Sequence, residues 1–178
     1  MPDLNKSIFE LSQESYEELF ERFETNMKFK GYTLQEWILV LDLRDLRPDY
    51  TLDDLDRYTL KIINQTSVIS NNYSLASANF NGLKKSVERS VMIAKQDIIR
   101  EIDLYNASNA NPATNKKYPS ADKLEADAYN RTLELQLNLA ISEMFFHFWK
   151  VQSDKIYLLN QRVTSLNVLK NIESRNTA

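Results

Sequence analysis

The sequence contains no cysteine, one histidine, two glycines and four prolines among its 178 residues. Without cysteine the chain forms no disulfide, no thiolate zinc site and no cysteine nucleophile. Two glycines are too few for the phosphate loops, dinucleotide-binding turns and nucleophile elbows that need glycine at fixed places. One histidine cannot build a multi-histidine metal site within a single chain. These absences disfavour most enzyme classes.

Charge is distributed unevenly along the chain. The formal net charge at pH 7 is −3, yet residues 1–60 hold 14 acidic and 7 basic residues, whereas residues 61–178 hold 11 acidic and 15 basic ones. The first segment therefore repels polyanions, and the second attracts them weakly. The densest apolar run, Met144 to Trp149, is far too short to cross a membrane. No basic segment followed by an apolar one opens the chain, so we expect a cytoplasmic protein without membrane contact.

The hydrophobic pattern predicts an all-α fold. Apolar residues recur every seven positions from Leu55 to Leu83, and then with an 11-residue period from Phe80 to Tyr105. Both periods are typical of one buried face on a long helix. A second long helix is expected from about residue 121 to 173, because Ser120 can cap it and no proline or glycine interrupts it. With a connector at 106–120, residues 51–178 predict an antiparallel, coiled-coil-like hairpin of two long helices.

Residues 1–50 predict a separate, small and acidic helical head. Apolar residues from Tyr16 to Met27 have helical spacing, and Gly31 is placed to end that helix. Thr33 with Glu36 then forms a capping-box pattern that opens a short helix.

The second long helix carries more apolar side chains than one stripe can hold. A two-helix hairpin would leave part of this surface uncovered, which predicts self-association of the chain. The residues that we assign to this oligomer interface are Met144, Phe145, Phe148, Trp149, Ile156, Leu159, Val163 and Leu166.

Residues that could carry catalysis have structural explanations. His147 lies within a cluster of aromatic residues, where a packed or interfacial histidine is expected, and no partner for acid–base chemistry has an evident spacing. Asp53, Asp54 and Asp56 follow Thr51 at a helix start, where acidic side chains stabilise the first turn. We therefore expect no enzymatic activity, no metal and no cofactor.

Basic residues in the middle of the chain suggest a nucleic-acid interface. Single-stranded nucleic acid is held by cations on its phosphates and by aromatic side chains that stack on its bases. The alternative is a solvated helix face with ion pairs between residues four apart, such as Lys84 with Glu88. In an oligomeric ring even a modest cluster becomes a strong electrostatic track. The candidate residues are Lys84, Lys85, Arg89, Lys95, Arg100, Lys116, Lys117 and Tyr118.

A characteristic layout of elements covers residues 60–175. A long helix with scattered basic residues ends in Asp103-Leu104-Tyr105, and a polar connector carries the element Lys116-Lys117-Tyr118-Pro119. A second helix follows, with an aromatic cluster and the run from Lys155 to Leu159. This layout resembles the UvsY-like recombination mediators of tailed phages. The resemblance implies a non-enzymatic protein that forms a ring-like oligomer, for example of six or seven copies, in the host cytoplasm. It also implies binding to single-stranded DNA, displacement of a single-strand-binding protein and loading of a RecA-like recombinase.

Two functions follow from these observations. The first is a recombination mediator that oligomerises and binds single-stranded DNA through Lys84–Arg100 and Lys116–Lys117. The second is a structural or scaffolding coiled-coil oligomer, such as a phage virion or assembly component, that binds no nucleic acid.

Overall fold

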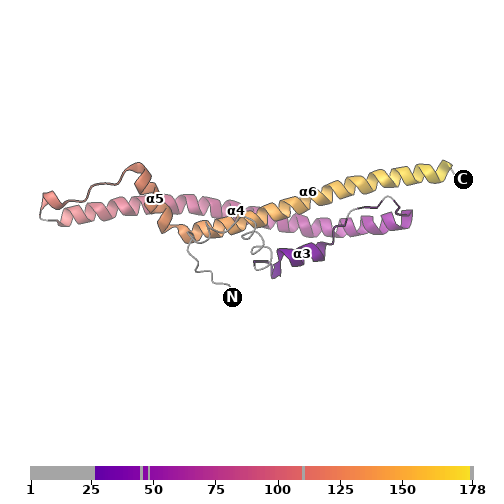
Figure 1. Ribbon diagram of the computed structural model, residues 1–178, viewed down its shortest axis with the longest axis horizontal. Helices are drawn as coiled ribbons and strands as arrows, with labels where there is room; N and C mark the ends of the chain where they lie inside the picture. The colour runs from indigo at the N-terminus through magenta and orange to yellow at the C-terminus, as the bar shows by residue number, and fades with distance from the viewer. Residues whose placement is uncertain (1–26, 45, 48, 110, 177–178) are drawn as a thin grey trace. The chain divides into compact units, whose positions relative to one another are not determined.

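A computed structural model describes residues 27–176, except residues 45, 48 and 110. The described chain is mostly helical, as the hydrophobic pattern predicts (Figure 1). A short hairpin of β1 (Lys28–Phe29) and β2 (Tyr32–Thr33) precedes helix α3 (Leu34–Leu41). Helix α4 spans Leu52–Ser108, the 3-10 turn η1 spans Pro112–Thr114, and helices α5 and α6 span Ala121–Arg131 and Leu133–Asn176.

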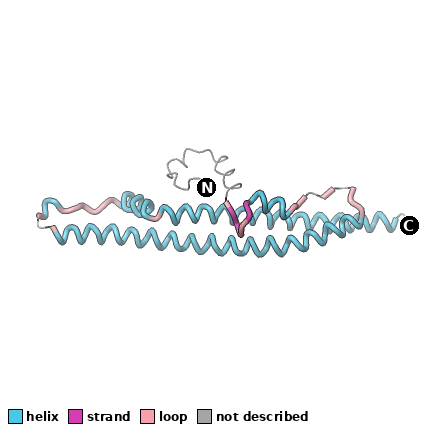
Figure 2. The backbone as a smooth tube through the Cα atoms, turned by 90° about the horizontal axis from the view of Figure 1, so that it is seen from below, coloured by secondary structure: helices cyan, strands magenta, loops and turns pink. Residues whose placement is uncertain are grey.

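The chain divides into two compact units. Within the described residues, unit 1 consists of residues 27–68 and 152–176, and unit 2 consists of residues 69–151. The helices α4 and α6 each contribute to both units, and in each unit a part of α4 packs against a part of α6. Figure 2 shows these helices side by side.

The hairpin corrects one detail of the all-α prediction. Lys30 and Gly31 have φ values of 50° and 87°, the left-handed conformation that a tight two-residue β-turn requires. Gly31 therefore lies in a turn between two strands, where the sequence analysis expected it to end a helix. The helix expected from Tyr16 to Met27 lies, except for Met27, outside the described residues.

Unit 1 is built on two capped helices. Thr33 and Glu36 form the predicted capping box at the start of α3, whose buried side chains are Leu34, Trp37 and Leu41. Thr51 and Asp54 make the equivalent reciprocal bonds at the start of α4, where the backbone N–H of Asp54 donates to the Thr51 hydroxyl. Contacts between the two segments include the ion pair of Lys61 with Asp42, at 2.5 Å.

Most of the predicted core positions of the long helices are buried. Those of α4 in unit 1, Leu55 and Ile62, are 1% and 2% exposed, and those of α6, Leu159 and Val163, are each 2% exposed. One core cluster of unit 2 consists of Val87, Val91, Ala94, Ile98 and Ala128, with Ile102, Leu124, Leu135 and Leu139 packed around it. The seven- and 11-residue periods therefore mark the buried face of α4, except at its end, where Tyr105 is 41% exposed.

The aromatic residues of unit 2 show the direction of pairing. Phe146 of α6 stacks against Tyr73 and Phe80 of α4, with ring centroids 5.6 Å and 5.3 Å apart. Leu135, which precedes Phe146 on α6, packs on the cluster that begins at Val87, which follows Phe80 on α4. The two helices therefore run antiparallel in this unit, as predicted.

One boundary differs from the prediction. The sequence analysis expected one helix from about residue 121 to 173, but the structure breaks it at Thr132, between α5 and α6. Thr132 has φ −110° and ψ 16°, and its hydroxyl donates to the carbonyls of Ala128 and Tyr129. Threonine hydroxyls that bond back to the preceding turn can bend helices. Thr59, Thr66 and Thr164 make the same bond inside unbroken helices, however, so this bond accompanies the break at Thr132 and does not by itself explain it.

Candidate nucleic-acid interface

The candidate interface lies in unit 2, on α4 and on the connector that follows it. Val87, Val91 and Ile98 face the core, which fixes the direction of every other side chain on this part of α4. Lys85 and Arg89 are one turn apart, and Arg100 follows Arg89 by 11 residues, or about three turns. These three cations therefore form one row along the outer side of α4.

A second pair of cations borders the core. Lys84 and Lys95 are also separated by 11 residues, so they share a side of the helix. Lys95 reaches Glu125 on α5 with an Nζ–Oε2 distance of 3.4 Å. Lys95 therefore helps to hold α5 on α4, whereas Lys84 is exposed.

Most of the predicted cations have no acidic partner among the residues that the structure describes. Lys84 does not pair with Glu88 there, although the two are four residues apart. The members of the set that are exposed and make no ion pair with a described residue are Lys84, Lys85, Arg89, Arg100, Lys116 and Lys117. Their charge is therefore available to an external polyanion.

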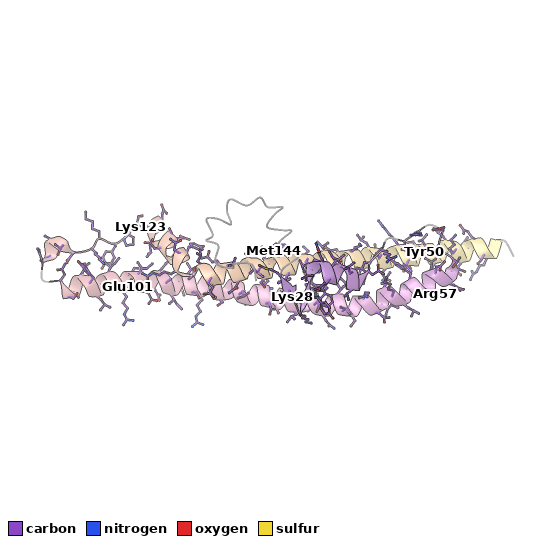
Figure 3. The ribbon with its side chains drawn as sticks, turned by 60° about the horizontal axis from the view of Figure 1, so that its bottom comes forward. Lys28, Tyr50, Arg57, Glu101, Lys123 and Met144 are labelled. Atoms are coloured by element: carbon purple, nitrogen blue, oxygen red, sulfur yellow. The ribbon has the colours of Figure 1, made fainter. Side chains whose placement is uncertain are left out.

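The acidic residue that follows Arg100 in the sequence, Glu101, is paired with another cation. Both guanidinium Nη atoms of Arg131, at the end of α5, donate to the Glu101 carboxylate at 2.7 Å and 2.8 Å. This bidentate pair lowers the pKa of Glu101, and the charge of its carboxylate is balanced by Arg131. Figure 3 labels Glu101 on α4 and Lys123 on α5 in this part of unit 2.

Asparagine side chains order the connector. The Asn106 side chain accepts from the backbone N–H of Lys116 at 2.8 Å and donates to its carbonyl at 3.0 Å. Asn111 caps η1, and Asn109 donates to the Thr114 hydroxyl at 2.8 Å. Sequence reasoning identified this segment only as a helix breaker; its clustered asparagines, which favour local turns, were the signal for an ordered loop.

The aromatic side chains of the connector are held against the end of α4. The Lys116 Nζ lies 4.3 Å from the centroid of the Tyr105 ring. The Tyr118 hydroxyl donates to the Asp103 carboxylate, and this bond raises the pKa of Tyr118. Tyr118 is nevertheless 59% exposed and Tyr105 is 41% exposed. The connector therefore presents Lys117 and Tyr118 at the C-terminal end of α4, which itself presents the ring of Tyr105.

The residues assigned to the oligomer interface have a different environment. Phe145, Trp149, Ile156, Leu159 and Val163 are buried within the chain, and Met144, Phe148 and Leu166 are partly buried. The apolar surface that we expected to remain uncovered at these residues is thus largely covered by the chain itself. Their role in an oligomer stays a prediction.

His147 is exposed beside Phe146, and its Nε2 lies 3.7 Å from the Glu143 carboxylate, one turn earlier. The expectation of a histidine packed within the chain is therefore wrong, and an interfacial histidine stays a prediction. In the part of the chain that the structure describes, no three His, Asp or Glu side chains lie together as a metal site would require. None of the described helices combines the length and apolar character of a membrane span.

No family model, curated protein or solved structure matches this chain.

Proposed function

We propose that the chain is a non-enzymatic recombination mediator, which self-associates, binds single-stranded DNA and helps to load a RecA-like recombinase. The observation that carries the DNA-binding part is the row of exposed cations on α4, Lys85, Arg89 and Arg100, which make no ion pair with a described residue. Cations in such a row lower the free energy of a phosphate backbone laid along the helix, because counterions are released from it.

Two tyrosines supply the aromatic part of a site for single-stranded DNA: Tyr105 at the end of α4 and Tyr118 in the connector. Bases of a single strand stack on exposed aromatic rings without regard to sequence, at about 1–3 kcal/mol per base. Tyr105 and Tyr118 lie beside Lys116 and Lys117. A strand that follows the cations of α4 to its C-terminal end would meet these rings. The mechanism needs no covalent step: a strand held at many weak contacts is arranged for the recombinase.

A salt titration tests this function. The double variant Lys84→Ala/Lys85→Ala should bind fluorescent oligo-dT more weakly than the parent. The slope of log K against log[salt] should become shallower by about 0.7 for each phosphate that the variant no longer neutralises. Lys28→Ala is the matched control, since Lys28 is exposed on β1 of unit 1, and it should keep the parental slope. An unchanged slope in the double variant would refute this interface.

The second candidate, a scaffolding oligomer without nucleic acid, rests on the exposed apolar residues of α6. Val168, Leu169 and Ile172 are 55%, 55% and 50% exposed. A parent protein that self-associates but ignores oligo-dT even at low salt would favour this candidate.

A further inference from the structure

Helix α6 has two apolar faces in unit 1. Ile156 and Val163 are buried, whereas Leu158 and Ser165, two residues further along, are about 200° round the helix from them. On this outer side Leu158, Val168, Leu169 and Ile172 are all at least 50% exposed. A helix that is apolar on two opposite sides is typical of one that packs between two partners, and the described chain supplies a partner on only one of them.

Helix α4 shows the same arrangement in unit 1. Leu55 and Ile62 are buried, whereas Leu60 and Ile63 are 63% and 58% exposed. The outer faces of the two helices, however, differ in charge. On the α4 outer face Asp53 and Asp56 precede Leu60 by two turns and one turn and outnumber the exposed Arg57 beside them, and neither aspartate makes an ion pair with a described residue.

The α6 outer face has the opposite net charge, since its cations Lys155 and Arg162 outnumber Asp154, which is exposed one turn before Leu158. Lys155 and Arg162 lie beside Leu158, are exposed and make no ion pair with a described residue. Arg162 also helps to line an open groove of about 470 Å³, formed by Leu46, Leu158, Gln161, Arg162, Ser165 and Leu166. The groove offers apolar walls and a cation at its edge.

From this complementarity we infer that the α4 outer face (Leu60, Ile63, Asp53 and Asp56) of one copy binds the α6 outer face (Leu158, Arg162, Val168, Leu169 and Ile172) of a second copy. Leu60 enters the groove, and Asp56, one turn before it, meets Arg162. The inference rests on the self-association in the proposed function and supplies its surface. It does not depend on DNA binding.

The two faces are different surfaces of the same unit, so the contact is head-to-tail. Such a contact leaves one free face on each end of a dimer, and copies continue to add until a ring closes or a filament grows. Pairing between like faces is disfavoured, because it would place two faces of net negative charge, or two of net positive charge, against each other.

Two variants that each block one face test the inference. Leu60→Glu places a third acid on the α4 face, and Leu158→Glu places a carboxylate in the groove. Sedimentation velocity without DNA should show that the parent associates and that each variant alone does so at least about tenfold more weakly. Leu104→Glu, at a residue that is 61% exposed in unit 2, is the control and should associate like the parent.

Mixing the two variants tests whether the contact is head-to-tail or joins like faces. Each keeps one intact face, so an equimolar mixture should form a dimer and nothing larger. A Leu60→Glu variant that assembles like the parent would overturn the inference in favour of pairing between α6 helices. A parent that remains monomeric, or variants that both behave like the parent, would also overturn it.

The ion pair provides an independent test that does not rely on apolar substitutions. Asp56→Lys and Arg162→Glu should each weaken association, and the double variant should restore it, because the charges are exchanged. Failure of the double variant to recover more than the single ones would refute the contact of Asp56 with Arg162. Oligo-dT binding is measured separately: an assembly that forms through these faces but binds no strand would refute the proposed function and leave this inference intact.

Discussion

At the scale of the residue, small polar side chains mark the point where the predicted second helix changes direction. The Thr132 hydroxyl donates to the preceding turn, and the Gln136 side chain donates to both Tyr129 and Thr132, at 3.0 Å and 2.9 Å. Nothing in the local sequence of residues 128–136 forbids a continuous helix, since threonine and glutamine both occur in helix interiors. Thr59 and Thr66 make the same back-bond in the unbroken helix α4, so the place of the break could not be predicted from Thr132 itself.

Adjacent isoleucines on α4 provide the sharpest test of the core in unit 2. Ile98 is 6% exposed and belongs to the apolar cluster, whereas Ile99 is 38% exposed. Ile98→Ala should lower the free energy of unfolding by about 2–5 kcal/mol, because it removes buried methyl groups and leaves a cavity. Ile99→Ala should change it by about 0.5 kcal/mol or less. Urea denaturation of both variants measures this difference, and equal losses would contradict the assigned register of α4.

At the scale of the element, the periodic pattern predicted the long helices but not their attachments. The caps at Thr33 and Ser120 and the buried face of α4 follow from local rules that a sequence displays directly. The position of α5 does not, because it depends on Arg131 reaching Glu101, 30 residues away. Contacts at such a separation depend on where the connector turns, and no local pattern encodes that.

In the candidate interface, too, the local pattern was predictable from the sequence and the contacts between distant residues were not. Exposure of Lys85, Arg89 and Arg100 follows from the 11-residue spacing of the core, since they lie between the buried positions. The clamp of Asn106 on Lys116 could not be anticipated, because it joins the end of one element to a loop ten residues later. For the oligomer interface the most apolar run was selected, and the chain itself buries most of it.

The pair of Arg131 and Glu101 makes the docking of α5 dependent on pH. Bonding to Arg131 lowers the pKa of Glu101 below its ordinary value of 4.5. The stabilisation is therefore fully present above that value and is lost as the pH falls through the lowered pKa of the folded state. Amide exchange in α5 should accelerate in this acidic range relative to the rest of unit 2.

A substitution separates this pair from general acid unfolding. Glu101→Gln should raise amide exchange in α5 already at neutral pH and remove most of its additional acceleration in acid. Glu88→Gln is the matched control, because Glu88 is an exposed acid on α4 that makes no ion pair with a described residue. If both variants exchange like the parent, Glu101 does not hold α5 in place.

At the scale of the whole molecule, the two proposals make a joint prediction about strand length. Each copy offers only a few cations, and the chain as a whole carries a net charge of −3, so one copy should hold a strand weakly. Linked copies bind a long strand at several sites, and each further contact is intramolecular once the first has formed. Affinity should therefore rise with strand length much more steeply for an assembly than for a single copy.

The face-blocked variant Leu158→Glu tests this linkage. It should bind an oligo-dT that contacts only one copy about as well as the parent, because Lys85, Arg89 and Arg100 lie in unit 2 and are unchanged. For a strand long enough to contact several copies its affinity should fall roughly 100-fold or more, since avidity requires the assembly. Lys84→Ala/Lys85→Ala should instead weaken both strands. Fluorescence anisotropy over a series of strand lengths distinguishes the two patterns. If Leu158→Glu loses the same affinity for short and for long strands, self-association does not supply the avidity and the joint prediction is wrong.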